Sequence, residues 1–285
     1  MIKILEPRPR LCPGQPPPKY PPTGNPFLKA IVGDLENMGA RGVTIDGYID
    51  DRDGNITRII YKREFEDDAG DFNPLDLYQS DVVRSVKTYY KTLARALGCG
   101  IDFVFIPAKR NQAYAFAAEP PFAETVYLKY ISTFDDYAER IRFFRKRTFN
   151  VTKPLKVANS GMECYLANVR GKDPFPGDID LAIYREDKLV NIAEFKTHNL
   201  PTPIVAESFD KYRKQDWRRL KVICDLCAAL GMGGYYFVIW GERHPEIKIQ
   251  KISIAGEIVS EEIIPKVPAR AARILLEKVK ERGVS

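Results

Sequence analysis

Residues 176–198, with the sequence PGDIDLAIYREDKLVNIAEFKTH, constrain the fold of this chain more than any other stretch. Apolar residues alternate with polar ones on both sides of a charged turn. This period of two predicts two strands joined as a hairpin. The same period places Glu194 and Lys196 on one face of the second strand and Phe195 on the other. The hairpin therefore carries acids at positions where strands of a core normally carry apolar residues.

The register of this hairpin decides whether its acids meet. Pairing Tyr184 with Val190 places Asp180 directly opposite Glu194. Like charges that face each other across a strand pair destabilise it, and a metal cation bound by both carboxylates would remove that cost. A shift of one residue would move every side chain to the opposite face. We therefore expect a metal-binding pair of carboxylates, on the condition that this register holds.

The composition indicates a globular protein with enough residues for two domains. The chain has 285 residues, of which 45% are hydrophobic and 29% charged, values typical of folded domains. It lacks a run of about 18 apolar residues, and its N-terminus lacks the apolar region of a signal peptide. We therefore expect a cytoplasmic protein with no membrane partner. The net charge of +6 permits a polyanionic partner without establishing one.

The cysteines predict reduced thiols. The chain has five, an odd and scattered number, and no secretion signal accompanies them. Cys224 and Cys227 have the spacing of metal ligands, but a zinc site usually shows two such pairs. Two buried cysteines on a helix are the reading we prefer. Glutamine and histidine are sparse beside plentiful Arg, Lys, Glu and Ile, which hints at a thermophile.

The order of predicted elements divides the chain into three parts. Residues 1–26 are rich in proline and predict an extended arm, either loose or laid across another surface. Residues 27–150 predict a separate N-terminal α+β domain. Its expected helices cover residues 27–38, 75–97 and a segment from 133 onward, and its expected strands cover residues 43–49, 56–65, 101–106, 113–117 and 126–131.

Residues 151–285 predict a second domain of the α/β (α+β) class. Its core is a mixed sheet built in the order α-β-β-α-β and flanked by helices. The expected elements are a helix over 155–169, the hairpin, a helix over 206–230, strands over 233–240 and 247–254, and a helix over 268–281. No chemistry is recognisable in residues 27–150, so the function is sought in this second domain.

This element order, with an Asp on the first strand and Glu-x-Lys fourteen residues later, resembles the PD-(D/E)xK nuclease superfamily. The family has the restriction-endonuclease-like fold, and the likeness to its Holliday-resolvase and RecB-type members covers roughly residues 151–255. It implies a nuclease, most simply an endonuclease, that hydrolyses phosphodiester bonds in DNA with Mg²⁺ or Mn²⁺. Asp180, Glu194 and the Phe195 carbonyl would hold the metal, and Lys196 would orient the attacking water.

The resemblance also implies further residues around the metal. Glu163 on the preceding helix would complete the site, as a glutamate does in many relatives. Asp178 is a rival or auxiliary ligand, because the proline that usually precedes the family's Asp is absent before Asp180. His198 could assist proton transfer, although a structural role is the alternative. Lys214 or Gln215 would supply the polar helix residue that several relatives use.

Two basic helices are candidate nucleic-acid contacts. The first interleaves cations with Phe143 and Phe144, a mixture that suits a phosphate backbone. The second carries a basic stripe beside its buried face. A solvated helix surface explains both patterns almost as well. The candidate contacts are Arg140, Arg142, Arg145, Lys146, Arg147, Lys211 and Arg218.

The sequence thus favours a metal-dependent nuclease acting on DNA, with RNA not excluded and a homodimer compatible with the fold. The alternative is a non-catalytic nucleic-acid-binding protein on the same fold, in which the acids are vestigial. A third hypothesis is an interaction scaffold built on the proline-rich arm.

Overall fold

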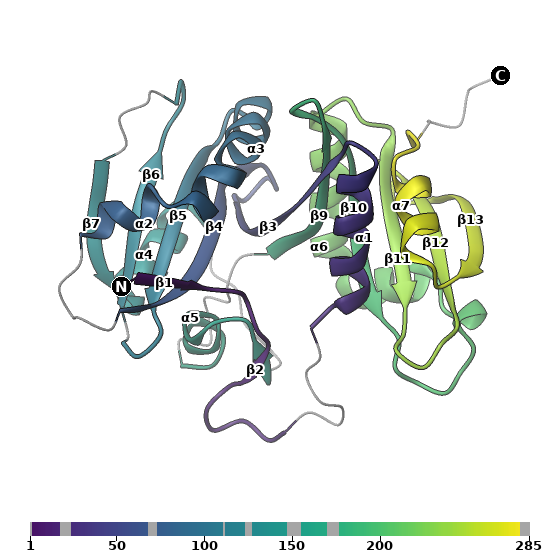
Figure 1. Ribbon diagram of the computed structural model, residues 1–285, viewed down its shortest axis with the longest axis horizontal. Coiled ribbons are helices and arrows are strands. Elements are labelled where there is room, and N and C mark those ends of the chain that lie inside the picture. Colours follow the sequence, from purple (N-terminus) through teal and green to yellow (C-terminus); the bar gives the residue numbers. More distant parts are fainter. Residues whose placement is uncertain are drawn as a thin grey trace. The chain divides into compact units, whose positions relative to one another are not determined.

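The computed structural model describes residues 2–17, 24–67, 73–110, 112–122, 127–146, 155–169 and 177–279. The protein has an α/β fold of mixed β-sheet flanked by helices, which confirms the predicted fold class (Figure 1). The chain divides into two compact units. The N-terminal unit comprises Met1–Gly24 and Asp46–Asp178, and the C-terminal unit comprises Asn25–Ile45 and Ile179–Ser285.

These units differ from the predicted domains. The border expected at residue 150 lies inside the N-terminal unit, which continues to Asp178. The segment Asn25–Ile45, expected to begin the first domain, belongs to the C-terminal unit. In the sequence, residues 46–178 are therefore inserted into the C-terminal unit, whereas residues 1–24 come before it. The apolar spacing of helix α1 (Pro26–Asn37) identified a buried face but not the sheet that buries it.

The N-terminal unit is a twisted run of strands with helices against it. Its sheet has the order β3-β4-β5-β6-β7, and β1 pairs with the far end of β4. Strand β3 (Arg41–Asp50) begins in the C-terminal unit and ends in this one. The other elements are β1 (Ile2–Leu5), β2 (Arg10–Leu11), β4 (Ile56–Asp67), α2 (Pro74–Tyr78), α3 (Asp81–Leu97), β5 (Gly100–Pro107), β6 (Gln112–Ala118), β7 (Tyr127–Thr133), α4 (Phe134–Arg145), β8 (Val157–Ala158) and α5 (Gly161–Cys164).

Two predicted helices of this region are shorter than expected. The helix predicted over 75–97 is two helices, because Ser80 starts a new one by accepting a hydrogen bond from Val83 N. The helix predicted over 155–169 is reduced to α5 and a π-helical turn, Tyr165–Val169. The proline-rich arm is laid across its own unit through β1 and β2, at least over residues 2–17.

The prediction of five reduced thiols was wrong. Cys12 and Cys164 form a disulfide with a Cα–Cα distance of 5.3 Å. The pairing of β2 with β8 brings the arm against α5 and places the two thiols together. The two cysteines are 152 residues apart in the sequence, so the spacing of cysteines along the chain does not predict that they pair. The remaining cysteines, Cys99, Cys224 and Cys227, are free and buried, so the prediction holds for them.

Removing this disulfide is expected to lower the free energy of unfolding by about 2–4 kcal/mol, because the bridge restricts the unfolded chain. Cys12→Ser, Cys164→Ser and the double variant should lose similar amounts, since one bond is lost in each case. Urea unfolding with and without reductant measures the effect. Reductant should destabilise only the native sequence. A thiol count of five rather than three in the unfolded, unreduced protein would contradict the bridge.

The C-terminal unit is a sheet with helices on both faces (Figure 1). Its strand order is β13-β12-β11-β10-β9-β3, with β10 and β11 parallel and joined through α6. Its remaining elements are α1, β9 (Gly177–Arg185), β10 (Lys188–Thr197), the 3₁₀ turn Ile204–Ala206, α6 (Phe209–Ala229), β11 (Gly234–Trp240), β12 (Glu246–Ser253), β13 (Ile258–Pro265) and α7 (Pro268–Leu275).

The two faces of this sheet bury different residues. Leu181, Phe195 and Val238 pack in one core with the apolar sides of α1 and α7. The alternate residues face α6, as shown by Phe237, whose ring lies 5.2 Å from that of Phe209. Residues of β10 and β11 are in parallel register, with Glu194 beside Phe237. The α6 face is therefore the one on which the predicted acids lie.

The hairpin has the predicted register in the part of its two strands that leads to the acids. Tyr184 pairs with Leu189 instead of Val190, but a bulge between Leu189 and Asn191 absorbs one residue. Beyond the bulge, Ala193 lies opposite Leu181, which is the register expected from the sequence. A bulge adds one residue to one strand only, so it can restore a register that the turn displaces.

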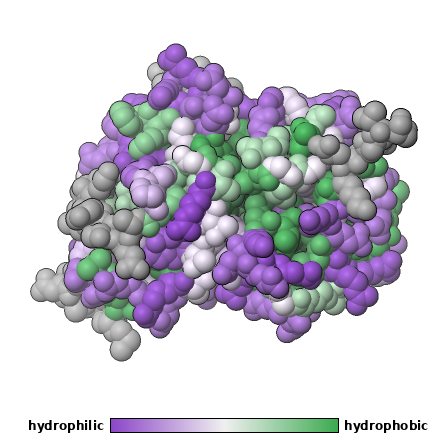
Figure 2. All heavy atoms as spheres, turned by 90° about the horizontal axis from the view of Figure 1, so that it is seen from above, coloured by the Kyte–Doolittle hydropathy of each residue, from purple (hydrophilic) through white to green (hydrophobic). Residues whose placement is uncertain are grey.

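No helix of the described residues is long and apolar enough to cross a membrane. Hydrophilic residues cover much of the face shown in Figure 2.

Candidate active site

Strands β9 and β10 bring three predicted site residues to the α6 face. Leu181 and Phe195 point into the opposite core, so period two turns Asp180, Glu194 and Lys196 toward α6. The side chain of Glu194 is 1% exposed and that of Lys196 is 20% exposed. The strands thus hold one carboxylate in the interior and a lysine at the edge of solvent.

Glu194 is buried beside two cations. Its Oε1 lies 2.7 Å from Arg219 Nη2 and 3.7 Å from Lys196 Nζ. A carboxylate removed from water is strongly destabilising unless a charge or a metal compensates it. Arg219 on α6 supplies that compensation in this structure. The position next to Glu194 Oε1 is therefore one that a cation occupies.

Helix α6 is irregular where it meets this group. Asp216 has φ −135° and ψ 25°, outside the helical region, although the helix continues on both sides. Its Oδ2 lies 3.5 Å from Lys196 Nζ and 3.8 Å from Arg219 Nη1. Backbone outliers persist where surrounding structure holds them, and they cluster at functional sites. Asp216 thus forms a second anionic position, 43% exposed, for the same two cations.

Asp180 is tied to the backbone of the neighbouring strand. Its Oδ2 accepts a hydrogen bond of 2.8 Å from Phe195 N. Its own carbonyl accepts one of 3.0 Å from Thr44 Oγ1 on β3. The side chain is therefore directed at the Glu-x-Lys segment. This geometry supports Asp180, rather than Asp178, as the partner of Glu194.

The donors of this group suit Mg²⁺ in kind. Carboxylate oxygens are hard ligands, and Mg²⁺ is commonly held by one or two carboxylates together with substrate phosphates. The described residues contain no group of three or more His, Cys, Asp or Glu side chains placed to hold a metal. The site would thus be a two-carboxylate site built from Asp180 and Glu194, and a metal there would compete with Arg219 for Glu194.

Asp178 lies on β9 two residues before Asp180, and Glu163 lies in the N-terminal unit. The Glu163 carboxylate accepts a 2.7 Å hydrogen bond from Asn159 N and forms an ion pair with Lys62. Burial lowers the pKa of Lys62 to about 8, although Asp46 and Asp178 oppose that shift. The family resemblance implied Glu163 as a further metal ligand on the helix before the hairpin, and Glu163 does lie on a helix, the short α5.

His198 has a structural place. It is 3% exposed, its Nε2 lies 2.7 Å from the Thr202 carbonyl, and its ring stacks on His244 at 5.0 Å. This arrangement supports the structural alternative over a role in proton transfer. Of the two predicted helix residues, Lys214 is exposed, and the side chain of Gln215 lies outside the described part of the chain.

The predicted basic cluster on α4 is largely engaged within its own unit. Arg140 donates hydrogen bonds of 3.0 and 2.7 Å to the fully buried Asp102. Arg142 bonds Glu139 at 2.8 Å, and Arg145 is only 3% exposed. These arginines stabilise the N-terminal unit, which argues against a continuous phosphate-binding stripe.

The other predicted cations lie on the surface or outside the described residues. Lys146 and Arg218 are exposed. Lys211, also exposed, pairs with Glu207 at 2.6 Å. Although burial raises the pKa of Glu207, hydrogen bonds from Lys211 and Tyr212 lower it overall. Arg147 falls outside the residues that the structure describes.

Asp216 and Arg219 are the site residues that sequence reasoning missed. Their spacing of three along a helix places them on one side of it, which is a usable signal. Both lie within a highly charged segment, RKQDWRRLK, in which several other charged side chains are equally plausible candidates. No proline or glycine near Asp216 predicts the kink in this helix.

Comparisons with known proteins add no family. No family model and no curated protein matches the sequence. Among solved structures, the sex pheromone staph-cAM373 precursor was found with 8% identity and a TM-score of 0.17, over 88% of this chain and 100% of that chain. Such a TM-score does not indicate a shared fold.

Proposed function

We propose that the protein is a metal-dependent nuclease that hydrolyses phosphodiester bonds in DNA, as an endonuclease. One observation carries the proposal: Asp180 and Glu194 lie on neighbouring strands on one face, with Lys196 two residues further on that face. The group is surrounded by a second cation, Arg219, and a kinked helix. These are the residue types that phosphodiester hydrolysis requires.

Each residue has a part in the proposed reaction. Mg²⁺ or Mn²⁺ held by Asp180 and Glu194, with the Phe195 carbonyl as a third donor, would polarise the phosphate and activate a water. Lys196 orients the attacking water and offers positive charge where the phosphate becomes more negative. Arg219, once released from Glu194, adds a second donor to the phosphate. Asp216 holds both cations in place before substrate arrives.

The proposed substrate is DNA, with RNA as an outcome that the assay distinguishes. The net charge of +6 is compatible with a polyanionic substrate. We place the enzyme in the cytoplasm, where a disulfide is uncommon except in hyperthermophiles. The Cys12–Cys164 bridge and the scarcity of glutamine both agree with such a source.

The proposal is tested by incubating the full chain with labelled duplex, single-stranded, flap and junction DNA and with matching RNA. Each substrate is paired with Mg²⁺, Mn²⁺ or EDTA. Cleavage of at least one DNA form that depends on the metal is the expected result. Cleavage that persists in EDTA, or that is confined to RNA, would contradict it.

The second candidate is a nucleic-acid-binding protein without catalysis. The ion pair between Arg219 and Glu194 favours this alternative, because it compensates the buried carboxylate without any metal. In that case the protein binds DNA equally well in Mg²⁺ and in EDTA and cleaves none of the substrates above.

A further inference from the structure

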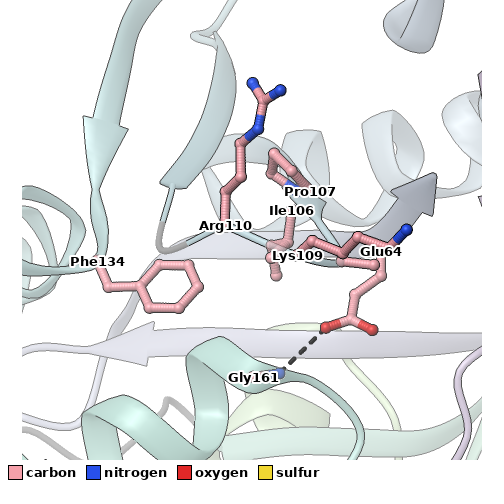
Figure 3. A pocket seen from close by; sticks show the side chains of 8 residues that line it. Glu64, Ile106, Pro107, Lys109, Arg110, Phe134 and Gly161 are labelled. Atoms are coloured by element: carbon pink, nitrogen blue, oxygen red, sulfur yellow. Dashed lines mark hydrogen bonds between the residues drawn. The ribbon is translucent and has the colours of Figure 1, made fainter. Parts of the chain in front are cut away.

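The N-terminal unit contains a pocket that none of the proposed chemistry uses. Its volume is about 470 Å³, within the range of small-molecule sites, roughly 300–1,000 Å³. Figure 3 shows the β5–β6 turn on one side and the start of α5, at Gly161, on the other. All eight lining residues belong to this unit: Glu64, Ile106, Pro107, Ala108, Lys109, Arg110, Phe134 and Gly161.

The pocket has an apolar wall and a basic rim. Ile106 and Phe134 are 1% and 3% exposed, so they form a firm floor that belongs to the core of the unit. Lys109 and Arg110 are exposed and stand on a tight turn, in which Arg110 N donates to the Pro107 carbonyl. A ligand in this pocket would therefore contact an apolar surface and two neighbouring cations.

The charges of the pocket add up to a preference for a dianion. Glu64 contributes one negative charge, and Arg10 pairs with it. Lys109 and Arg110 are then in excess by two positive charges. A phosphate monoester carries about −1.5 to −2 at neutral pH, whereas a backbone diester carries only −1. The balance favours a terminal phosphate over a phosphate within a strand.

Glu64 provides an acceptor at the other side of the pocket. Its Oε1 accepts a 3.0 Å hydrogen bond from Gly161 N and pairs with Arg10, so the carboxylate is held in a fixed orientation (Figure 3). Both contacts are made to Oε1, so within the described part of the chain Oε2 is left as an acceptor for a ligand donor such as an amino or imino group of a base. A nucleotide combines such donors with an apolar ring and a phosphate.

We propose that this pocket binds a nucleotide through its phosphate monoester, either as a free nucleoside monophosphate or as the phosphorylated end of a DNA strand. Lys109 and Arg110 bind the phosphate, the base lies against Ile106 and Phe134, and Glu64 accepts a hydrogen bond from the base edge. The strand-end form rests on the proposed function only in its choice of DNA. The free-nucleotide form does not depend on it.

Calorimetry on the full chain in EDTA tests the pocket apart from cleavage. The titrants are the four deoxynucleoside monophosphates, deoxyadenosine and inorganic phosphate. At least one nucleotide is expected to bind tenfold or more tightly than both deoxyadenosine and phosphate. Fluorescence polarisation with 5′-phosphorylated, 3′-phosphorylated and unphosphorylated oligonucleotides then separates the two sources, since only strand-end binding gives a preference for a phosphorylated end.

The matched variants are K109M/R110M and the control R84M/K91M, which removes two cations from α3 outside the pocket. The first pair is expected to lose at least tenfold in affinity with an unchanged melting temperature, and the second to bind normally. Equal binding of phosphate and nucleotide, or normal binding by K109M/R110M, overturns the proposal. So does an absence of binding to every titrant and oligonucleotide, even if metal-dependent cleavage is found.

Discussion

Replacing Lys196 by Met is expected to slow DNA cleavage by about 10²–10⁴-fold, the range for loss of a group that assists proton transfer. The affinity for DNA should change by less than about threefold, because a single partly exposed cation such as Lys196 contributes little to the binding of a polyanion. Glu194→Gln should be at least as damaging to cleavage, since it removes a proposed metal ligand and the partner of Arg219. Single-turnover rates and filter binding measure the two effects separately.

Stability must be followed with each variant. Removing one partner of a buried ion pair can destabilise a protein by about 3–5 kcal/mol, and Glu194 is fully buried. Lys196 is the safer test because its side chain is 20% exposed. Lys221→Met is the matched control: this lysine lies on α6 but pairs with Asp225 at 2.5 Å. Full cleavage by Lys196→Met, at a native melting temperature, would refute the assignment.

The parts of the site that the sequence predicts correctly depend on local periodicity. Alternation with period two places Asp180, Glu194 and Lys196 on one face, and the structure has them there. The assumed register survives for a reason that the pattern does not contain. Next to the turn, the strand pairing is shifted by one residue from the predicted register. The bulge between Leu189 and Asn191 restores the predicted register on the side of the strands that carries the acids.

The parts that the sequence does not predict depend on contacts between distant segments. Helix α1 has a clear apolar face, but only the fold shows that it packs on Leu181 and Phe195, far along the chain. The glycine at position 42 is required by the same long-range packing, because a Cβ there would lie 2.9 Å from Leu181 Cδ1. The disulfide of Cys12 with Cys164 is likewise a long-range contact. Local patterns cannot encode such pairings.

Replacing Arg219 by Met is expected to tighten the binding of Mn²⁺ about tenfold while slowing cleavage. Arg219 Nη2 lies 2.7 Å from Glu194 Oε1, where a divalent cation would bind. Unit charges 4 Å apart interact by about 4 kcal/mol at an effective dielectric constant of 20. The net effect is smaller because the guanidinium can move toward Asp216, 3.8 Å away. Calorimetry with Mn²⁺ in the absence of DNA measures the affinity.

The opposite signs of the two effects distinguish this role from a structural one. An arginine that only maintains the fold would, when removed, weaken metal binding and cleavage together. Removing an arginine that first competes with the metal and then binds the phosphate should tighten metal binding and slow cleavage. Arg213→Met is the control, since Arg213 lies on the same helix but donates to the Gly256 carbonyl at 2.9 Å. Unchanged Mn²⁺ affinity in Arg219→Met would show that Arg219 and the metal do not share Glu194, and the two-carboxylate site would have to be abandoned.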